Sequence, residues 1–294
     1  FADNGYKTLA AGKIFHRKDK RFFQEYLPTG GFGPKPNKKI SQPHGHPLWD
    51  WGIFPDDDNL MPDMKCAKWA VEQLKKKHDK PFFMGVGFYR PHVPMYATKK
   101  WFDMHPRENI KLPLVQKNDR NDLSQYAIDL TNLNHVSPTH KWVSEAGQWE
   151  HAVQSYLASV TFADHCLGLV LDALESSAYG NNTVIALFSD HGFHLGEKER
   201  WAKRSLWEDG TRVPIIVTAP GYKKDQRSER PAELLDVFPT LLELAGLPAD
   251  STQEGQSLVP LMKDPKKEWP HPAITSFGLG NYSVRTTRYR FIQY

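Results

Sequence analysis

The sequence predicts an α/β protein, with a mostly parallel sheet flanked by helices and a small antiparallel subdomain at the C-terminal end. Apolar runs of strand length alternate with helical patterns between residues 63 and 244. After about residue 270 the chain changes to short segments of the kind that form antiparallel hairpins. We therefore expect an α/β domain over residues 1–269 and the start of an antiparallel subdomain over residues 270–294.

The first elements are expected between residues 63 and 87. Residues 1–62 carry little periodic pattern and much Gly, Pro and His, which predicts a long irregular loop. Helical spacing begins at Asp63 and is carried by Ala67, Ala70, Val71 and Leu74. The continuous apolar run over residues 81–87 follows directly, and a run of this length after a helix indicates a buried parallel strand.

The second half of the chain repeats this alternation. An apolar stripe predicts a long helix over residues 153–174. Strand-like runs return over residues 183–189 and 213–218, and a helix over residues 234–244 is capped by Gly246. The antiparallel segments are expected near residues 273–276, 282–285 and 289–294.

Composition excludes several classes of protein. With 39% hydrophobic and 24% charged residues, the chain is globular in make-up and not disordered. Its net charge of +4 is spread along the sequence, so we expect no nucleic-acid partner. No run approaches the roughly 18 apolar residues of a membrane span, so none is expected. Cys66 and Cys166 suit neither a disulfide framework nor a zinc ribbon, and both lie on helical patterns as structural thiols.

The most informative stretch begins where the run over residues 183–189 ends in Asp190 and His191. Ligands of open α/β sheets bind outside the carboxyl ends of strands, and a carboxylate beside an imidazole can bind a metal ion. The alternative is that Asp190 caps the next turn and His191 forms only a hydrogen bond. Lys203 follows through a loop rich in glycine and charge, and a cation beside a metal site suits an anionic substrate.

Two further segments carry candidate site residues. Lys13 and His16 follow Gly12, and both could project into one cleft if this glycine ends a short strand. His92 stands between two prolines just beyond the run over residues 81–87. Lys13 and His16, taken singly, have the simpler interpretation of surface groups.

Together these segments resemble the type I sulfatases of the alkaline-phosphatase-like superfamily, and most closely the iduronate-2-sulfatase-like and choline-sulfatase-like branch. The spacing Lys-x-x-His matches the iduronate branch instead of the commoner Lys-x-His. The resemblance spans nearly the whole chain and is carried by Gly5-Tyr-Lys-Thr with Lys13 and His16, by Phe83 to Pro94, by Ser189-Asp-His-Gly with Leu195-Gly-Glu197, by Trp201-Ala-Lys203 and by Gly210-Thr-Arg-Val-Pro214.

The resemblance implies a sulfuric ester hydrolase that acts on a sulfated saccharide in a secreted, periplasmic or lysosomal setting. It implies one calcium ion with Asp190 and His191 as ligands. The nucleophile of the family is a formylglycine made from Cys or Ser in a Cys/Ser-x-Pro/Ala-x-Arg signature, and its hydrate attacks sulfur. The resemblance further implies that Lys13 and His16 contact this nucleophile. It also implies that His92 and Lys203 hold the sulfate ester and assist its leaving oxygen.

The sequence departs from the family pattern at the nucleophile. Cys66 is followed by Ala-Lys-Trp-Ala and Cys166 by Leu-Gly-Leu-Val, so neither begins the signature. The signature and the first pair of metal-binding aspartates belong upstream of Gly5 in the family. We therefore expect an N-terminally incomplete piece, shortened at the C-terminal end as well, that is inactive by itself.

Two other functions stay open. A metal-dependent phosphodiesterase or phosphomutase of the same superfamily would bind zinc at the Asp-His pair, but would need further Asp and His ligands in place of Lys13 and Lys203. A sulfatase-like binding module that has lost its nucleophile would keep the motifs without activity. A separate cluster, His44 and His46, has no third ligand nearby in the sequence and indicates an ordinary loop.

Overall fold

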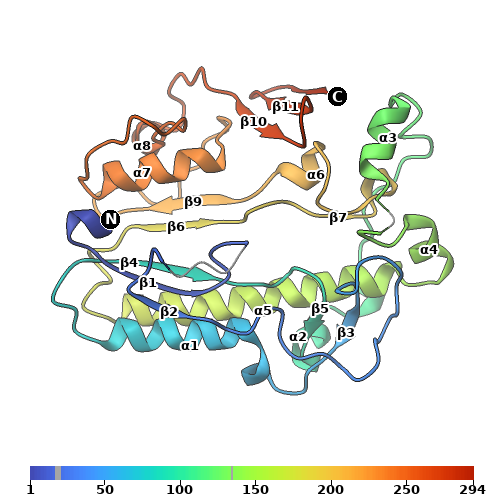
Figure 1. The fold of residues 1–294 in the computed structure, drawn as a ribbon, viewed down its shortest axis with the longest axis horizontal. Coiled ribbons are helices and arrows are strands. Elements are labelled where there is room, and N and C mark those ends of the chain that lie inside the picture. The colour runs from blue at the N-terminus through green and yellow to red at the C-terminus, as the bar shows by residue number, and fades with distance from the viewer. Residues whose placement is uncertain (17–20, 134) are drawn as a thin grey trace. The chain divides into compact units, whose positions relative to one another are not determined.

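The computed structural model describes residues 1–16, 21–133 and 135–294. It confirms the α/β class, with helices against parallel strands and three antiparallel strands near the C-terminal end (Figure 1). The chain divides into two compact units, residues 1–114 with 134–180 and residues 115–133 with 181–294. We call these the first and the second unit. The boundary at residue 269 is a different division and stays a prediction.

The first unit is built on a parallel sheet of strand order β2-β1-β4. These strands are β1 (Lys7–Gly12), β2 (Glu25–Leu27) and β4 (Phe82–Gly87), the last confirming the strand expected over residues 81–87. A second parallel pair joins β3 (Trp51–Ile53) to β5 (Met95–Ala97).

Strands β1, β2 and β3 correct the prediction of a loop throughout residues 1–62. Two of them have three residues each, which is too short for a period to show in the sequence. β1 lies between two neighbouring strands and is buried from Thr8 to Gly12, so its small residues do not alternate with polar ones.

Four α-helices accompany these strands, namely α1 (Pro62–Lys75), α2 (Lys99–Asp103), α4 (His140–Glu145) and α5 (Trp149–Glu175). α1 and α5 confirm the two helices expected in this part of the chain. They share a core in which Met64 and Ala67 of α1 join Phe162 and Cys166 of α5. By length and composition alone α5 could cross a membrane. The expected lack of a membrane span therefore stays a prediction.

The second unit contains β6 (Ile185–Phe188) and β9 (Ile215–Thr218), which confirm the two strands expected there. They pair antiparallel, in contrast to the parallel pairs of the first unit. A short hairpin joins β7 (His194–Leu195) to β8 (Trp201–Ala202). The helices of this unit are α3 (Gln125–Thr131), α6 (Glu208–Thr211), α7 (Val237–Leu244) and α8 (Val259–Lys263).

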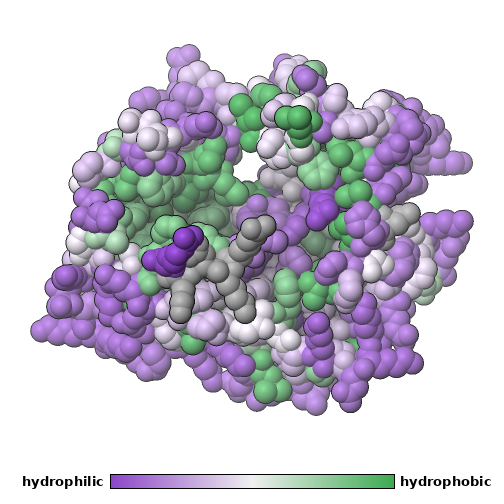
Figure 2. Space-filling model, in the orientation of Figure 1, coloured by the Kyte–Doolittle hydropathy of each residue, from purple (hydrophilic) through white to green (hydrophobic). Residues whose placement is uncertain are grey.

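The expected antiparallel group is confirmed as the sheet β10-β11-β12, with β10 at Ala273–Ser276, β11 at Tyr282–Arg285 and β12 at Arg290–Gln293. Apolar side chains of the second unit reach the surface, among them Ile216, Leu235 and Ile274, and hydrophobic residues are visible over α7 and β9 in Figure 2. The 3-10 helices are η1 (Ala2–Asn4), η2 (Asp58–Leu60), η3 (Arg107–Asn109), η4 (Glu197–Glu199) and η5 (Leu234–Asp236).

Candidate active site

The second unit brings Asp190, His191 and Lys203 together beyond the carboxyl end of β6. His191 Nδ1 lies 2.8 Å from the carbonyl oxygen of Gly192, and because a carbonyl only accepts, Nδ1 carries the proton. The unprotonated Nε2 accepts a hydrogen bond from Lys203 Nζ at 2.8 Å and lies 3.5 Å from Asp190 Oδ1. An ammonium group, an imidazole lone pair and a carboxylate therefore meet at one place.

The β7–β8 hairpin carries Lys203 to this place. Lys203 follows Ala202, whose φ of 75° lies in the left-handed region that residues other than glycine rarely adopt. Ala202 pairs with His194 across the hairpin, so both strands fix this backbone conformation. The chain direction immediately before Lys203 is thus set by the hairpin.

A close backbone approach holds the loop of His191. The N–H of Gly192 donates to the carbonyl oxygen of Gly210 at 3.1 Å. A Cβ atom at Gly192 would lie 2.1 Å from the carbonyl oxygen of Asp209, so no residue with a side chain fits without displacing backbone. The glycine of the Asp-His-Gly motif is therefore explained by the packing of α6 against the loop.

Asp190 and His191 are spaced as two ligands of one cation would be, which allows the expected calcium site to be compared with the structure. Their donor atoms, Oδ1 and Nε2, lie 3.5 Å apart. Two ligands about 2.4 Å from a calcium ion and at right angles to each other would be about 3.4 Å apart. Calcium takes about six to eight ligands, whereas within residues 1–16, 21–133 and 135–294 no group of three or more His, Cys, Asp or Glu side chains could hold a metal ion. The pair fits part of a calcium site.

The first unit places Lys13 and His92 beyond the carboxyl ends of two neighbouring parallel strands. β1 ends at Gly12 and β4 at Gly87, and the register pairs these glycines. The N–H of Lys13 donates to the carbonyl oxygen of Gly87 at 2.9 Å. His16 lies on the same loop as Lys13 and is exposed. The condition that Gly12 ends a short strand is met, while the roles of the side chains stay predictions.

His92 is held by its own loop. Its Nδ1 lies 2.7 Å from the carbonyl oxygen of Val93, so Nδ1 carries a proton and Nε2 is the atom that can change protonation. Its backbone N–H donates to the carbonyl oxygen of Tyr89 at 2.9 Å. The imidazole also lies against the ring of Phe32, with 4.8 Å between the ring centroids. The histidine therefore has one defined tautomer when neutral.

Asp63 and Arg90 anchor this loop, whereas the sequence pattern indicates only a helix start at Asp63. Asp63 lies in the first turn of α1, is completely buried, and accepts hydrogen bonds from the backbone N–H groups of Tyr89 and Arg90. Burial raises the pKa of the Asp63 carboxyl group, although the Arg90 charge opposes the shift. The Arg90 side chain donates to the carbonyl oxygens of Tyr96 at 2.9 Å and Phe32 at 3.1 Å. No sequence pattern links residues so far apart.

The two cysteines are confirmed as structural thiols. Cys66 lies on α1 and Cys166 on α5, and both are completely buried. Burial raises the pKa of the Cys66 thiol to about 12, and burial likewise raises the pKa of Cys166. Neither supplies a thiolate at neutral pH, so neither is the nucleophile.

The histidine pair His44 and His46 serves the backbone. His44 Nε2 accepts the N–H of Thr139 at 3.0 Å, and His46 Nδ1 accepts the N–H of Leu48 at 3.2 Å. One ring nitrogen of each histidine is used in a loop contact, as the simpler interpretation of this cluster expects.

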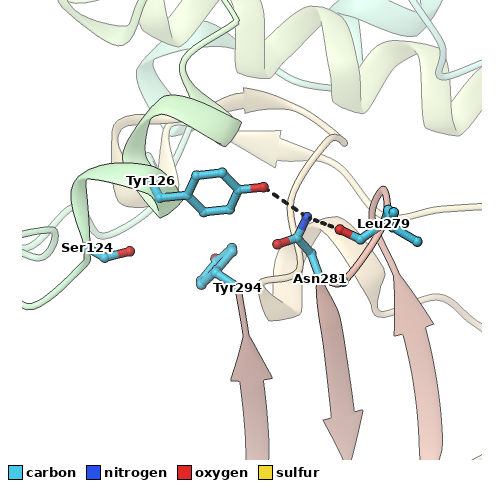
Figure 3. A pocket seen from close by; sticks show the side chains of 6 residues that line it. Ser124, Tyr126, Leu279, Asn281 and Tyr294 are labelled. Atoms are coloured by element: carbon cyan, nitrogen blue, oxygen red, sulfur yellow. Dashed lines mark hydrogen bonds between the residues drawn. The ribbon is translucent and has the colours of Figure 1, made fainter.

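A separate pocket of about 430 Å³ lies in the second unit (Figure 3). Asn281 Nδ2 donates to Tyr126 Oη at 3.3 Å and to the carbonyl oxygen of Leu279 at 3.4 Å. None of the lining side chains is a Lys, Arg, His, Asp or Glu, so the pocket supplies no fixed positive charge for an anionic ester. It is lined by Ser124, Tyr126, Leu279, Gly280, Asn281 and Tyr294.

Comparison with known proteins decides the family. Residues 1–247 match the protein-family model described as Sulfatase. The chain belongs to the sulfatase family. A sulfatase of Formosa agariphila is 40% identical to this chain over 307 residues, which cover 100% of this chain and 60% of that protein. The iduronate 2-sulfatase of Mus musculus is 28% identical and covers 99% of this sulfatase chain and 68% of its own length. The chain thus spans 60% of the length of the Formosa relative.

Solved structures share the fold. A phosphonate monoester hydrolase from Silicibacter pomeroyi superposes with a TM-score of 0.71 at 17% identity, covering 100% of this chain and 70% of its own. A protein solved with its substrate D-glucosamine-2-N,6-O-disulfate superposes with a TM-score of 0.67 at 19% identity, covering 99% of this chain and 71% of its own. The expected sulfatase-type fold is confirmed. Because a phosphonate hydrolase has it too, the fold leaves the choice between sulfur and phosphorus esters to the site.

Proposed function

We propose that the protein is a sulfuric ester hydrolase that removes sulfate from a sulfated saccharide. The observation that carries this proposal is the group of Asp190, His191 and Lys203, in which a cation, a lone pair and a carboxylate meet at a strand end of a sulfatase-family chain. A relative from Bacteroides thetaiotaomicron is named a Δ4,5-hexuronate-2-O-sulfatase, and another fold neighbour was solved with a disulfated glucosamine. These names support the saccharide class.

The residues of this chain act on the ester as an anion site. The family resemblance implies that Lys203 and Lys13 would each supply positive charge to offset the charge of the sulfate oxygens, which is worth most where water is excluded. Lys203 can donate a proton from its ammonium group to the leaving oxygen as the sulfur–oxygen bond breaks. The family resemblance implies that His92 holds the sulfate ester together with Lys203, and its Nδ1 lies 2.7 Å from the carbonyl oxygen of Val93. His16 is exposed, and the family resemblance implies that it contacts the nucleophile together with Lys13.

Two groups outside the described residues complete the proposal. A calcium ion would be held in part by Asp190 and His191, and it would supply positive charge to the sulfate oxygens. Its binding to His191 Nε2 would require Lys203 to release that lone pair. A formylglycine would supply the nucleophile, as the family resemblance implies, because both cysteines of this chain are buried.

The competing function is hydrolysis of a phosphorus ester, which the fold permits. The presence of two lysines among the candidate residues favours sulfate, because a zinc phosphodiesterase needs further Asp and His ligands at those places.

The test is a panel of esters assayed with the full-length protein. We expect turnover of 4-nitrophenyl sulfate and sulfate release from a 2-O-sulfated uronate disaccharide, with loss of both on calcium chelation and recovery on adding calcium. Faster turnover of bis(4-nitrophenyl) phosphate or phenyl phosphonate, together with two bound zinc ions by metal analysis, would assign the phosphorus chemistry instead.

A further inference from the structure

We propose that His194 and Ser205 are positioning residues that hold Lys203 in place against His191. This inference deepens the proposed function and rests on it for its kinetic consequences. The claim that His194 and Ser205 position Lys203 concerns the second unit alone and can be tested without any substrate.

Three consecutive contacts connect these residues. His194 Nε2 and Ser205 Oγ lie 2.7 Å apart. The backbone N–H of Ser205 donates to the carbonyl oxygen of Lys203 at 2.8 Å. Lys203 Nζ then donates to His191 Nε2 at 2.8 Å. The hydroxyl of Ser205 is thus fixed to β7, while its backbone fixes the turn that carries Lys203.

The same atoms surround one glycine of α6. A Cβ atom built on Gly210 would lie 2.4 Å from Ser205 Oγ, 2.9 Å from the carbonyl oxygen of Lys203 and 3.2 Å from His194 Nε2. The carbonyl oxygen of Gly210 accepts the N–H of Gly192, the residue after His191. Gly210 therefore lies against the backbone of Lys203, the His194–Ser205 pair and the residue after His191.

The pair superficially resembles a hydrolase triad, because Asp209 Oδ2 lies 3.9 Å from His194 Nδ1. Burial excludes that role. His194 has no exposed surface and Ser205 is 5% exposed, so no substrate reaches the hydroxyl. Burial also lowers the pKa of His194 to about 3, far below that of a general base at neutral pH. A neutral, buried imidazole that binds one hydroxyl is a structural support.

Burial makes the contact between His194 and Ser205 difficult to break. A buried hydrogen bond is costly to break because neither partner finds water. Ala202 holds the left-handed conformation on the other side of Lys203, at the position paired with His194. Removing the Ser205 hydroxyl therefore leaves the turn around Lys203 with one anchor instead of two.

The substrate-independent test measures how fast Lys203 reacts with N-hydroxysuccinimide acetate, by peptide mass spectrometry. In the wild type we expect Lys203 to react more slowly than the exposed Lys223. In protein freed of calcium with EDTA, where Lys203 can bind His191 Nε2, Ser205→Ala should raise the rate at Lys203 about threefold or more, because the ammonium spends less time bound to His191. The matched control is Thr240→Val, which removes a buried hydroxyl of the same unit that bonds Asp236 and Leu258. It should leave the rate at Lys203 unchanged.

The kinetic test uses the full-length protein and two esters of different leaving ability. Ser205→Ala should lower kcat/KM for phenyl sulfate about tenfold and for 4-nitrophenyl sulfate less than about threefold, the pattern expected when Lys203 assists the leaving oxygen. In a protein that already carries Lys203→Ala, Ser205→Ala should cause no further loss of kcat/KM. A merely structural effect of Ser205→Ala would lower kcat/KM equally for both esters. It would also add to the loss of kcat/KM caused by Lys203→Ala.

The outcomes separate the two proposals. An unchanged labelling rate at Lys203 in Ser205→Ala overturns the positioning role, whatever the activity. If Ser205→Ala does not fold, His194→Gln is measured in its place with the same expectations. If the wild type hydrolyses neither sulfate ester, the proposed function fails, while the labelling rates still decide whether His194 and Ser205 hold Lys203.

Discussion

Cys66 illustrates how position decides the chemistry of a single side chain. It is completely buried, and burial raises the pKa of its thiol to about 12. At pH 8 only about one thiol in ten thousand would be ionised, and the thiolate is the reactive form. We expect iodoacetamide to leave Cys66 unmodified in the folded protein and to modify it fully in 6 M guanidinium. Rapid labelling of the folded protein would contradict the burial.

His194 gives a prediction for the dependence of stability on pH. Burial lowers its pKa to about 3, assisted by the nearby charges of Arg200 and Lys198, while Asp209 lies opposite Nδ1. An unfolded histidine binds a proton below about pH 6.5, whereas the folded one stays neutral. The unfolded state therefore gains protons first, and stability falls as the pH drops from 6.5 towards 3, by a few kcal/mol.

The measurement is urea denaturation of the wild type and of His194→Gln at several pH values. The wild type should lose more stability than the variant between pH 7 and pH 4, so that the difference between them shrinks as the pH falls. A difference that stays constant over this range would mean that His194 protonates in the folded state like an exposed histidine.

At the scale of elements, the paired ends of β1 and β4 depend on glycine. A Cβ atom at Gly87 would lie 2.0 Å from the carbonyl oxygen and 2.9 Å from the nitrogen of Lys13. Gly87→Ala should therefore separate the strand ends and cost about 2–4 kcal/mol of stability. Gly85→Ala is the matched control on β4, because the atom nearest to its Cβ would be the flexible end of Ile14 at 3.1 Å and no backbone atom is within that distance. Equal urea midpoints for the two variants would refute this account of the strand ends.

The elements differ in how well the sequence predicts them. The helix α5 and the strands β4, β6 and β9 are expected because each is a long stripe or a continuous apolar run. The antiparallel pairing of β6 with β9 is not expected, since the same apolar run suits a parallel or an antiparallel strand. β2 and β3 are too short for a period to show.

The site is predictable only where it is contiguous in the chain. Asp190 and His191 follow a strand directly, so their place at its end can be predicted. The contact of Lys203 with His191 depends on the β7–β8 hairpin and on the left-handed Ala202, which no local pattern indicates. Asp63 and Arg90 support His92 through burial and backbone contacts, and a sequence displays neither.

For the whole molecule, the nucleophile is the decisive question. No Cys or Ser of the 294-residue chain begins the formylglycine signature, and both cysteines are buried. We expect the chain, expressed as printed, to release no 4-nitrophenol from 4-nitrophenyl sulfate in the presence of calcium. Turnover that persists after replacing both Cys66 and Cys166 by Ala would show that another nucleophile operates.

The central claim is that Lys203 and its partners belong to a sulfate-ester site. The most direct measurement is sulfate release from a 2-O-sulfated uronate disaccharide by the full-length protein, followed by ion chromatography for the wild type, Lys203→Ala and the control Lys223→Ala. Lys223 is an exposed lysine of the same unit. We predict that Lys203→Ala lowers kcat/KM about a hundredfold or more, the scale of a lost charge-stabilising group, and that Lys223→Ala matches the wild type. Equal rates for all three proteins would contradict the claim.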